Sequence, residues 1–567
     1  MSLGLSPLAA APLAALWQPD IPDPVPGTVL VGTGAVDPIW AVALERPAGL
    51  ALVVPLGLTA GLPAAAFAFP AVAEPALPVL RYTDRGWIGE PTDPNAPNES
   101  WPARMLDAPS IVRTIPIYPT EARRSEVNAG EILLANADGA LDSLATDWRL
   151  AGRRLTVLRG PYRRGRRAAR SEFSTIGGFR IERVAQGTDR LRLPLGSAAA
   201  DLTMPASGTY AGTGSWEGTA EMAGQAKPIR YGIHRNVRPA IVVPGLLAAH
   251  LHDGPISAVL AVRGRGDPFG YAGDYPNLAA LAAATVAAGT YVTCLAAGWL
   301  RLGSTTSSLT VDLRGAAPAG AYLGTAAAIA ADLLGRRGGV TSDLAQAVSF
   351  YDWPVGEVRL DASGLTVAAA MDALASSVGG WWGADALGRF RGSQLLPPEI
   401  VGPSILLEPW MLATPPEEVD AAQAPWWRVR VDYRALGVTQ SGEDLGAVSD
   451  ADRALYGQAA QTATEYRPAV QSAFPGAQDG PQVPSAFDDA ADAQAMAVRL
   501  MDLHGTPRRT WRAEVRPDQA WRFWSVMEPG QPVSLTWSGI AALRGGRTMI
   551  LRGISARGDR LTLDLWG

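Results

Sequence analysis

The side chains best suited to metal chemistry in this 567-residue chain are its four histidines, at positions 234, 250, 252 and 504. In His250-Leu251-His252-Asp253, a strand would place both imidazoles on one side, and a third ligand would complete a zinc site. The sequence has no H-E-x-x-H motif and only one cysteine, so it supplies no evident partner for zinc. We interpret this stretch as a turn and predict no metal and no cofactor.

The single cysteine, Cys294, lies in the apolar, strand-like stretch Tyr291–Ala297. A nucleophilic thiolate needs a partly exposed, electropositive setting, so we expect Cys294 to be a small buried residue. No G-x-S-x-G nucleophile elbow with plausible partners is present. A glycosidase needs only two carboxylates at the right separation, and that alternative stays open. We predict that the chain has no catalytic residues and is not an enzyme.

Glycines punctuate the segment Tyr210–Gly232, which ends in Lys227-Pro228. A phosphate-binding loop also uses glycines, but it follows a strand and opens a helix whose N-terminus holds the anion. Proline keeps the preceding Lys227 out of the helical region, so no helix opens there. The glycines therefore indicate tight turns and close backbone approaches rather than a nucleotide site.

Nine arginines crowd the segment from Arg149 to Arg170. They could face an acidic partner subunit, line a passage for DNA, or form a solvated hairpin face. Only Tyr162 interleaves with them, which weakens a model in which single-stranded bases stack on aromatic rings. We name seven candidate subunit-interface residues: Arg159, Arg163, Arg164, Arg166, Arg167, Trp381 and Trp382.

Length and composition describe a chain of three to five domains with many short strands. The chain has 61 glycines and 46 prolines, which favour turns over long helices. Eighteen tryptophans suit cores and interfaces alike, and are mild evidence for assembly. The net charge of −5 does not indicate a nucleic-acid binder, and one cysteine fits assembly in a reducing cytoplasm.

An uncharged run between Arg46 and Glu74 is long enough to span a membrane. Prolines interrupt it at positions 47, 55, 63 and 70, and each would break a helical turn at a cost of about 3 kcal/mol. The first seventeen residues contain no lysine or arginine, unlike a signal peptide. We predict short strands here and no stable membrane span.

Hydrophobic periodicity places helices at residues 277–288, 325–334, 366–377 and 488–503, and another opening at Ser342 or Asp343. Alternation predicts strands at 152–160, 427–433, 510–515, 532–537, 547–553 and 560–566, and composition predicts a linker at 414–425. The expected fold is mainly β with α+β subdomains. Its predicted regions are an apolar Pro/Ala-rich stretch (1–80), a β-rich domain (81–240), an α+β domain (241–340), a helix-plus-sheet domain (341–413) and a C-terminal α+β or β-barrel domain (426–567).

Five separate stretches resemble tail-tip or baseplate hub proteins of tailed bacteriophages with siphophage-type tails. They are Tyr210–Val243, Gly130–Gly160 (GEILLANADGALDSL…GRRLTVLRG), Ala288–Gly315 (AGTYVTC…LRLG…LTVDLRG), Gly379–Gly392 (GGWWGADALGRFRG) and Gly546–Gly567, ending RLTLDLWG. No single motif is diagnostic, and the first eighty residues match less well. The order and spacing of the stretches carry the resemblance.

The resemblance implies a structural virion protein at the distal end of the tail, assembled in the host cytoplasm. Such hubs are symmetric oligomers, generally trimers, whose β-barrel-like domains line a channel. Implied partners are other copies of the chain, distal tail and fibre subunits, and DNA in passing. The alternative is a cell-wall hydrolase or carbohydrate-binding adhesin of the same particle. Trp381-Trp382 and Trp426-Trp427 are where a sugar-binding groove would be sought.

Overall fold

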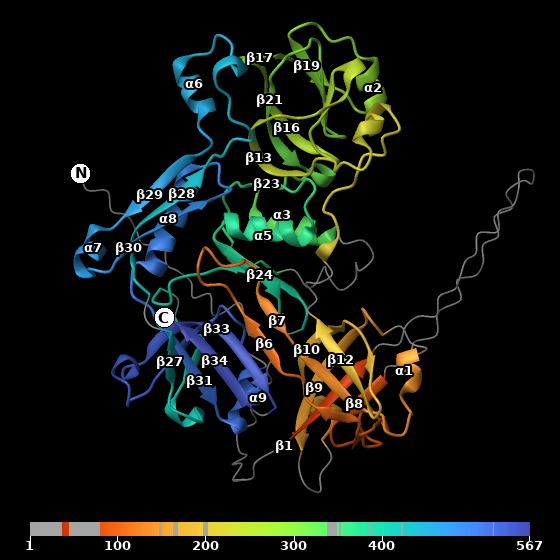
Figure 1. Cartoon of the computed structure of the whole chain (residues 1–567), viewed down its shortest axis with the longest axis vertical. Coiled ribbons are helices and arrows are strands. Elements are labelled where there is room, and N and C mark those ends of the chain that lie inside the picture. Colours follow the sequence, from red (N-terminus) through yellow and green to blue (C-terminus); the bar gives the residue numbers. More distant parts are fainter. Residues whose placement is uncertain are drawn as a thin grey trace, which may run out of the picture.

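The computed structural model describes residues 37–44, 80–146, 150–162, 168–196, 202–336, 349–350, 353–385, 387–400, 402–420, 423–524, 527–558 and 560–567. Within these ranges the chain is mainly β, with several sheets and α+β subdomains, as the sequence predicts (Figure 1). Two large sheets lie side by side at the bottom of Figure 1, two smaller ones form the top, and helices lie between.

The N-terminal sheet has eight strands, in the order β2-β1-β9-β10-β12-β8-β5 with β11 beside β12. Its strands are β1 (Asp37–Leu44), β2 (Leu80–Thr83), β5 (Met105–Asp107), β8 (Glu131–Ala135), β9 (Arg154–Tyr162), β10 (Ser174–Ile181), β11 (Ala185–Gln186) and β12 (Arg190–Gly196). The small pair β3 (Trp87–Ile88) and β4 (Ser100–Trp101) and helix α1 (Asp142–Thr146) accompany it. In β9, Leu155 and Val157 are fully buried, which confirms the predicted alternation.

The C-terminal sheet has the order β26-β32-β33-β34-β31-β27. Its strands are β26 (Ile405–Leu407), β27 (Glu417–Asp420), β31 (Thr510–Val515), β32 (Pro532–Leu535), β33 (Arg547–Arg557) and β34 (Arg560–Trp566), with helix α9 (Pro517–Trp524). Strand β6 (Ile111–Thr114) joins this sheet by pairing with β33, and β7 (Glu126–Asn128) pairs with β6. A segment early in the chain therefore completes a sheet built from its end.

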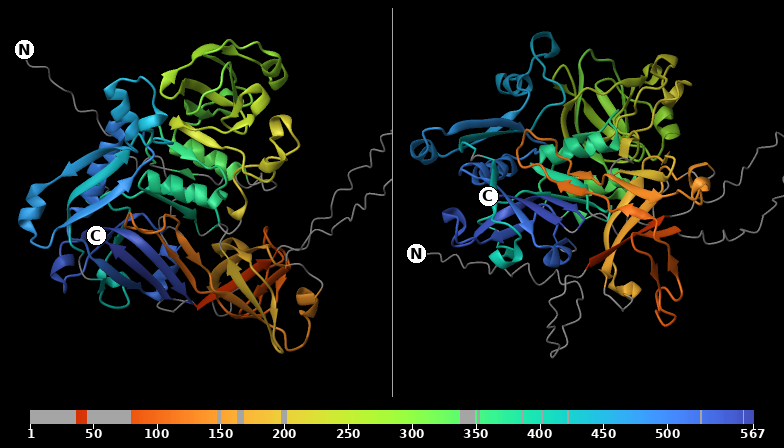
Figure 2. Two further views of the ribbon diagram at one scale, coloured as in Figure 1. Left: turned by 45° about the horizontal axis from the view of Figure 1, so that its top comes forward. Right: turned by 60° about the horizontal axis from the view of Figure 1, so that its bottom comes forward.

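One hydrophobic core lies between these two large sheets. Leu155, Val157 and Ile176 from the N-terminal sheet pack in the same buried cluster as Trp524 and Leu563 from the C-terminal part. The two views of Figure 2 show the two sheets in contact from both directions. Because burial of each large aliphatic side chain contributes roughly 1.5–3 kcal/mol, this shared core couples the two ends of the chain.

The upper part of Figure 1 holds two five-stranded sheets around a second core. One contains β13 (Arg230–Val237), β16 (Ile256–Gly264), β17 (Asp267–Pro268), β21 (Leu309–Ala316) and β23 (Arg359–Asp361). The other contains β14 (Ile241–Val243), β15 (Ala248–His250), β18 (Gly270–Asp274), β19 (Thr290–Cys294) and β20 (Trp299–Leu302), with helix α2 (Leu278–Ala283). Val311 and Leu313 of the first sheet share this core with Leu300 of the second and with Leu251, which follows β15.

A middle layer joins the upper and lower parts. It holds α3 (Ala326–Gly335), α5 (Val367–Ser377) and α8 (Ala490–His504), the small sheet of β22 (Ser349–Phe350), β24 (Gly380–Ala384) and β25 (Phe390–Gln394), and the sheet of β28 (Trp426–Tyr433), β29 (Gln461–Tyr466) and β30 (Gln478–Pro484). Helices α6 (Asp450–Gly457) and α7 (Pro468–Ala473) lie near the latter. Buried residues of α3, α5, α8 and β28 form one cluster.

Helix α5 matches its sequence signal closely. Thr366 is the N-cap and its side chain accepts a hydrogen bond from the amide of Ala369, as favoured at helix starts. The predicted apolar face, Val367, Ala370, Met371 and Leu374, is buried. Local capping and periodicity thus determine this helix.

Three predicted features differ from the structure or lie outside it. The predicted linker at 414–425 is wrong, because β27 lies within it and pairs with β31. Helix α2 ends at Ala283 rather than at residue 288, since Ala284 is extended. Ser342 and Asp343, and all of residues 1–80 except β1 and Leu80, lie outside the described residues. The predicted domain boundaries stay predictions.

The glycine-punctuated segment makes tight turns, as its composition indicates. Gly212, Gly214, Gly218 and Gly224 all have φ between 69° and 92°, which disfavours other residues. Strand β13 begins at Arg230, and no helix opens after Lys227 in this described stretch. Among the described residues, no helix is both long and apolar enough to cross a bilayer.

Candidate functional site

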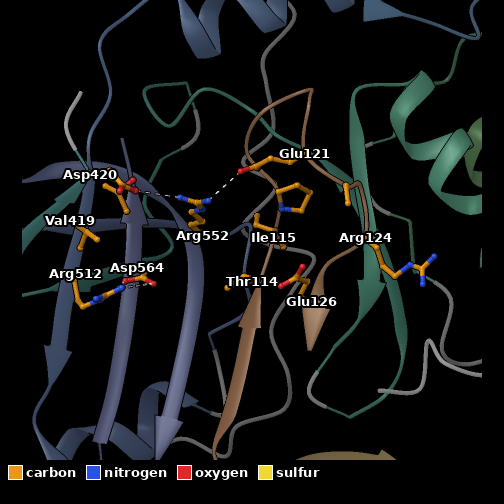
Figure 3. Close-up of a pocket in the computed structure, with 13 residues that line it drawn as sticks. Thr114, Ile115, Glu121, Arg124, Glu126, Val419, Asp420, Arg512, Arg552 and Asp564 are labelled. Atoms are coloured by element: carbon orange, nitrogen blue, oxygen red, sulfur yellow. Dashed lines mark hydrogen bonds and ion pairs between the residues drawn. The ribbon is translucent and has the colours of Figure 1, made fainter. Parts of the chain in front are cut away.

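A groove of about 490 Å³ opens where the connection between β6 and β7 crosses the C-terminal sheet. This junction groove is lined by Thr114, Glu121, Glu126, Asp420, Arg512, Arg552 and Asp564, among others (Figure 3). Its residues come from three distant parts of the sequence, near positions 114–126, 419–420 and 510–564. No spacing in the sequence could have indicated it.

Ion pairs span the junction groove. Arg512 pairs with Asp564 at 2.9 Å across β31 and β34. Arg552 lies 3.3 Å from Glu121 and 3.7 Å from Asp420, so it links the β6–β7 connection to β27 (Figure 3). A glycosidase holds two carboxylates on either side of a sugar ring, whereas each of these three carboxylates faces a guanidinium. These ion pairs therefore hold the β6–β7 connection against the C-terminal sheet.

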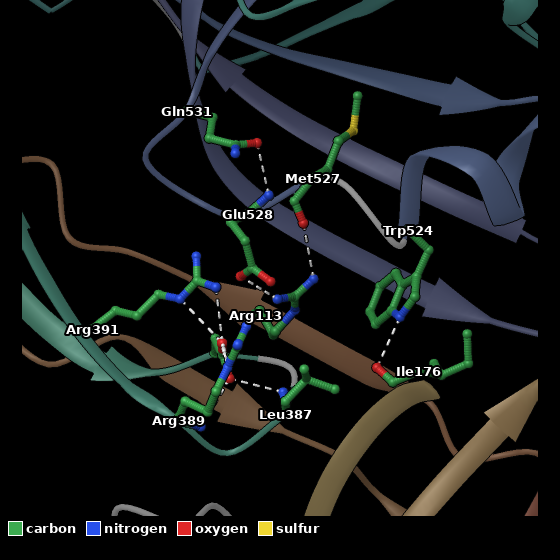
Figure 4. A network of polar contacts seen from close by, with 10 residues as sticks. Arg113, Ile176, Leu387, Arg389, Arg391, Trp524, Met527, Glu528 and Gln531 are labelled. Carbon is green, nitrogen blue, oxygen red and sulfur yellow. Dashed lines mark hydrogen bonds and ion pairs between the residues drawn. The ribbon is translucent and has the colours of Figure 1, made fainter. Parts of the chain in front are cut away.

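A second network lies between the two large sheets (Figure 4). The Arg113 side chain is only 2% exposed; its Nη1 donates to Glu528 Oε2 at 2.5 Å, and its Nη2 donates to the Met527 carbonyl at 3.3 Å. Its guanidinium lies 4.7 Å from the Trp524 ring centroid. Trp524 Nε1 in turn donates to the Ile176 carbonyl of β10 at 2.9 Å. This chain of contacts connects β6, the C-terminal segment and the N-terminal sheet.

Asp385 fixes the turn between β24 and β25. Its buried carboxylate accepts hydrogen bonds from the amides of Leu387 and Arg389 and pairs with the guanidiniums of Arg389 and Arg391 (Figure 4). The turn packs on the N-terminal sheet, since a Cβ added at Gly178 would lie 2.8 Å from the Leu387 carbonyl oxygen. A glycine at that position of β10 permits this approach.

The predicted interface tryptophans lie inside the chain. Trp381 is 9% exposed and Trp382 is fully buried. Trp382 Nε1 donates to Asp372 of α5 at 2.7 Å, and the same carboxylate pairs with Arg124, whose guanidinium lies 5.0 Å from the Trp382 ring centroid. In the described structure both rings therefore serve intrachain packing. A subunit contact through them stays a prediction.

Arg159 lies between the two large sheets rather than on an outer face. It lines a small gap together with Ile176, Trp524 and Leu561. The other candidate interface arginines, Arg163, Arg164, Arg166 and Arg167, lie outside the described residues. Whether the arginine cluster meets protein or DNA stays a prediction.

Three of the four histidines, His234, His250 and His252, are engaged in internal hydrogen bonds, whereas the buried Nε2 of His504 has no partner among the described residues. Tyr210 donates its hydroxyl proton to His250 Nδ1 at 2.6 Å, so His250 Nε2 carries the proton that it donates to the His252 carbonyl at 2.8 Å. His252 Nδ1 accepts from the amide of Arg230 at 2.9 Å. Burial lowers the pKa of His250 and that of His252 to about 3. Within the described residues no group of three or more His, Cys, Asp or Glu side chains could hold a metal.

Cys294 lies in β19 and is fully buried, as expected. Burial raises the pKa of its thiol, which disfavours the nucleophilic thiolate. His250 stacks on Trp299 with ring centroids 4.2 Å apart and an interplanar angle of 8°. The residues of this region that could do chemistry are thus components of a core.

No protein-family model matches this chain, and no curated protein sequence matches it. Among solved structures, it is similar to the tail protein from Neisseria meningitidis MC58, with a TM-score of 0.36, 12% identity, and coverage of 81% of this chain and 91% of that one. It is also similar to the 43 kDa tail protein of prophage MuSo2 from Shewanella oneidensis, with a TM-score of 0.33, 11% identity, and coverage of 81% and 93%. A topological model of the p2 virion baseplate in its activated conformation gives a TM-score of 0.19 at 7% identity, covering 85% of this chain and 97% of that one.

Proposed function

We propose that this chain is a structural subunit at the distal end of a bacteriophage tail, of the baseplate or tail-tip hub kind. In this role it joins the tail tube to central or receptor-binding fibres. Several copies, three in the simplest case, surround the tail axis and form part of the channel through which DNA leaves. The protein works by holding its neighbours in place and makes or breaks no covalent bond.

The main support for the proposal is the position in the fold of the five stretches that resemble tail-hub proteins. They supply β8 and β9 of the N-terminal sheet, β13, β14 and β19 to β21 of the upper sheets, β24 and β25, and the β33–β34 hairpin. Each stretch buries apolar side chains, such as Leu155, Val311, Trp382 and Leu563. The resemblance therefore covers the strands that build the cores of the protein. This suits a subunit whose role depends on its shape.

Closed cyclic symmetry suits a subunit of this kind. A subunit that surrounds an axis must present two different faces to its neighbours, and cyclic symmetry closes such contacts into a ring. Both outer strands of the C-terminal sheet, β26 and β27, are short edge strands that lack a second partner within the described sheet. Short or charged edges limit unspecific pairing and leave specific contacts possible.

The direct test is imaging of the purified full-length chain by negative-stain electron microscopy, together with its mass under native conditions. We expect a ring of identical copies. A particle carrying a gold-labelled copy should show the label at the tail end farthest from the head. A monomer that degrades purified peptidoglycan would instead support the cell-wall hydrolase, and a label elsewhere on the particle would exclude the hub role.

A further inference from the structure

A second cavity of about 490 Å³ lies on the outer face of the N-terminal sheet. Thr156 and Leu158 of β9 line it, whereas Leu155 and Val157 point to the shared core on the opposite face. Leu158 is the register partner of Thr175 of β10, which also lines the cavity. The volume falls within the range of small-molecule sites, roughly 300–1,000 Å³. We call this cavity the outer-face pocket.

An aromatic cluster forms one wall of the outer-face pocket. Trp101 packs edge-on against Trp87, with ring centroids 5.1 Å apart, and lies 5.9 Å from Phe173. Trp87 Nε1 donates to the Ala168 carbonyl at 2.8 Å, which anchors the cluster to the chain beyond β9. Trp101 is only 1% exposed and its buried Nε1 has no hydrogen-bond partner. The wall is rigid and contains a donor that lacks an acceptor.

Two guanidinium groups lie over the ring of Trp101 in this wall. The Cζ atoms of Arg81 and Arg170 lie 5.8 Å and 5.5 Å from the Trp101 ring centroid, within the range of cation–π contacts. Arg81 is ion-paired with Glu99, so their charges offset each other. No ion pair joins Arg170 to a carboxylate among the residues that the structure describes. Stacking holds both planar groups in place before any ligand arrives, which lowers the entropic cost of binding.

The remaining polar groups indicate the class of ligand. Thr156, Ser171, Thr175 and Asn95 line the pocket together with Arg170. They suit a ligand rich in hydroxyl groups, since each can donate or accept. The Arg170 guanidinium suits one carboxylate, which it can bind through two parallel hydrogen bonds. The Asp93 carboxylate, which accepts from the Arg170 backbone amide at 2.6 Å, and the Arg81–Glu99 pair limit the positive charge of the site, which disfavours a doubly charged phosphate.

We propose that the outer-face pocket binds a saccharide that carries a carboxylate. Arg170 binds the carboxylate, and the threonine, serine and asparagine side chains bind the sugar hydroxyls. Such a site does not depend on the tail role, because the pocket lies within a single chain. It also relocates the carbohydrate-binding alternative from the buried pair Trp381-Trp382 to the neighbourhood of Trp101.

Isothermal titration calorimetry with the full-length protein tests this site, using glucuronic acid, glucose and inorganic phosphate as probes. We expect glucuronic acid to bind, with glucose and phosphate at least about tenfold weaker. Arg170→Ala should weaken glucuronic acid binding about tenfold or more, because one charge-assisted contact is lost. Thr156→Val should weaken it less, since it removes one hydroxyl at nearly constant volume.

The matched control is Arg192→Ala. Arg192 lies on β12 of the same sheet and is ion-paired with Glu131, but it does not line the outer-face pocket. Its loss should leave glucuronic acid binding unchanged. The thermal midpoint of each variant shows whether it is folded. Equal effects of Arg170→Ala and Arg192→Ala in folded proteins, phosphate binding as tight as that of glucuronic acid, or no binding of glucuronic acid by the native chain would each overturn the proposal.

Discussion

Arg113 and Glu528 are 415 positions apart in the sequence, yet their side chains form an ion pair with a 2.5 Å contact between Nη1 and Oε2. The pair sits where β6 joins the C-terminal sheet, and Arg113 also contacts the Trp524 ring. A contact between the early and late parts of the chain is therefore built into the fold. The contact to the N-terminal sheet is made by Trp524, whose Nε1 donates to the Ile176 carbonyl of β10 in the core that the two large sheets share.

Removal of one partner of this pair should destabilise the protein strongly. Arg113→Met leaves the Glu528 carboxylate without its cation, and we expect a loss of about 3–5 kcal/mol in the free energy of unfolding. Urea denaturation followed by tryptophan fluorescence measures it. The exposed pair Arg190 and Asp189 supplies the control, and Arg190→Met should change stability little. Similar losses for both variants would contradict the assigned role of Arg113.

The burial of Trp382 predicts a stability effect that does not require a second subunit. Trp382→Ala creates a cavity beside α5 and leaves the Asp372 carboxylate without its indole donor. We expect a loss of about 3–5 kcal/mol, measured in dilute protein. Trp410, which is 54% exposed, is the matched control, and Trp410→Ala should change stability far less. If Trp382→Ala altered only the oligomeric state, the interface prediction would gain support instead.

Substitution by alanine should destabilise the protein to different extents at two glycines that have similar backbone angles. Gly232 has φ of 73°, and an added Cβ would lie 1.5 Å from the Val358 carbonyl oxygen across β13 and β23. Gly224 has φ of 80° with nothing within 4 Å. Gly224→Ala should cost about 1–2 kcal/mol from the left-handed backbone alone. Gly232→Ala should lower the free energy of unfolding clearly more, because the backbone at Val358 must also move. Thermal denaturation measures both variants, and a larger loss for Gly224→Ala would contradict this prediction.

His504 should make stability depend on pH. Burial, with smaller contributions from Arg508 and Arg123, lowers its pKa to about 3, from an ordinary value near 6.5. The unfolded chain therefore binds a proton that the folded chain does not, and stability falls as pH drops from about 6.5 toward 3. The contribution is about 1.4 kcal/mol per pH unit in that window.

His504→Phe keeps an aromatic ring among Tyr118, Trp426 and Trp566 but cannot take up a proton. Its free energy of unfolding should vary less steeply with pH between 6 and 4 than that of the native chain. Urea denaturation at several pH values gives both slopes. Equal slopes would show that His504 is protonated in the folded state at those pH values.

Local signals in the sequence were sufficient for several elements. The Thr366 cap and the spacing of Val367, Ala370, Met371 and Leu374 determine α5, because a helix is built from contacts within four residues. Alternation in β31 and in the β33–β34 hairpin likewise predicts strands with one buried face. The burial of Cys294 also follows from its apolar neighbours.

Other features were settled only by contacts between distant segments. Strand β27 is Glu417–Asp420, all four of its residues are exposed, and its composition resembles a linker, so only pairing with β31 makes it a strand. The outer-face pocket needs Arg81, Trp101 and Arg170, whose spacing matches no local period.

The sequence alone thus determined the mainly β character, helices α3, α5 and α8, and the absence of any recognisable catalytic motif. The tertiary structure decided that β6 completes a sheet from the other end of the chain, that Trp381 and Trp382 are buried, and where the two large pockets lie. The physical reason is that a strand's own residues encode its two faces but not its neighbour. Any two strands can form the same backbone hydrogen bonds. Which strands pair is therefore decided by how their side chains pack in the core.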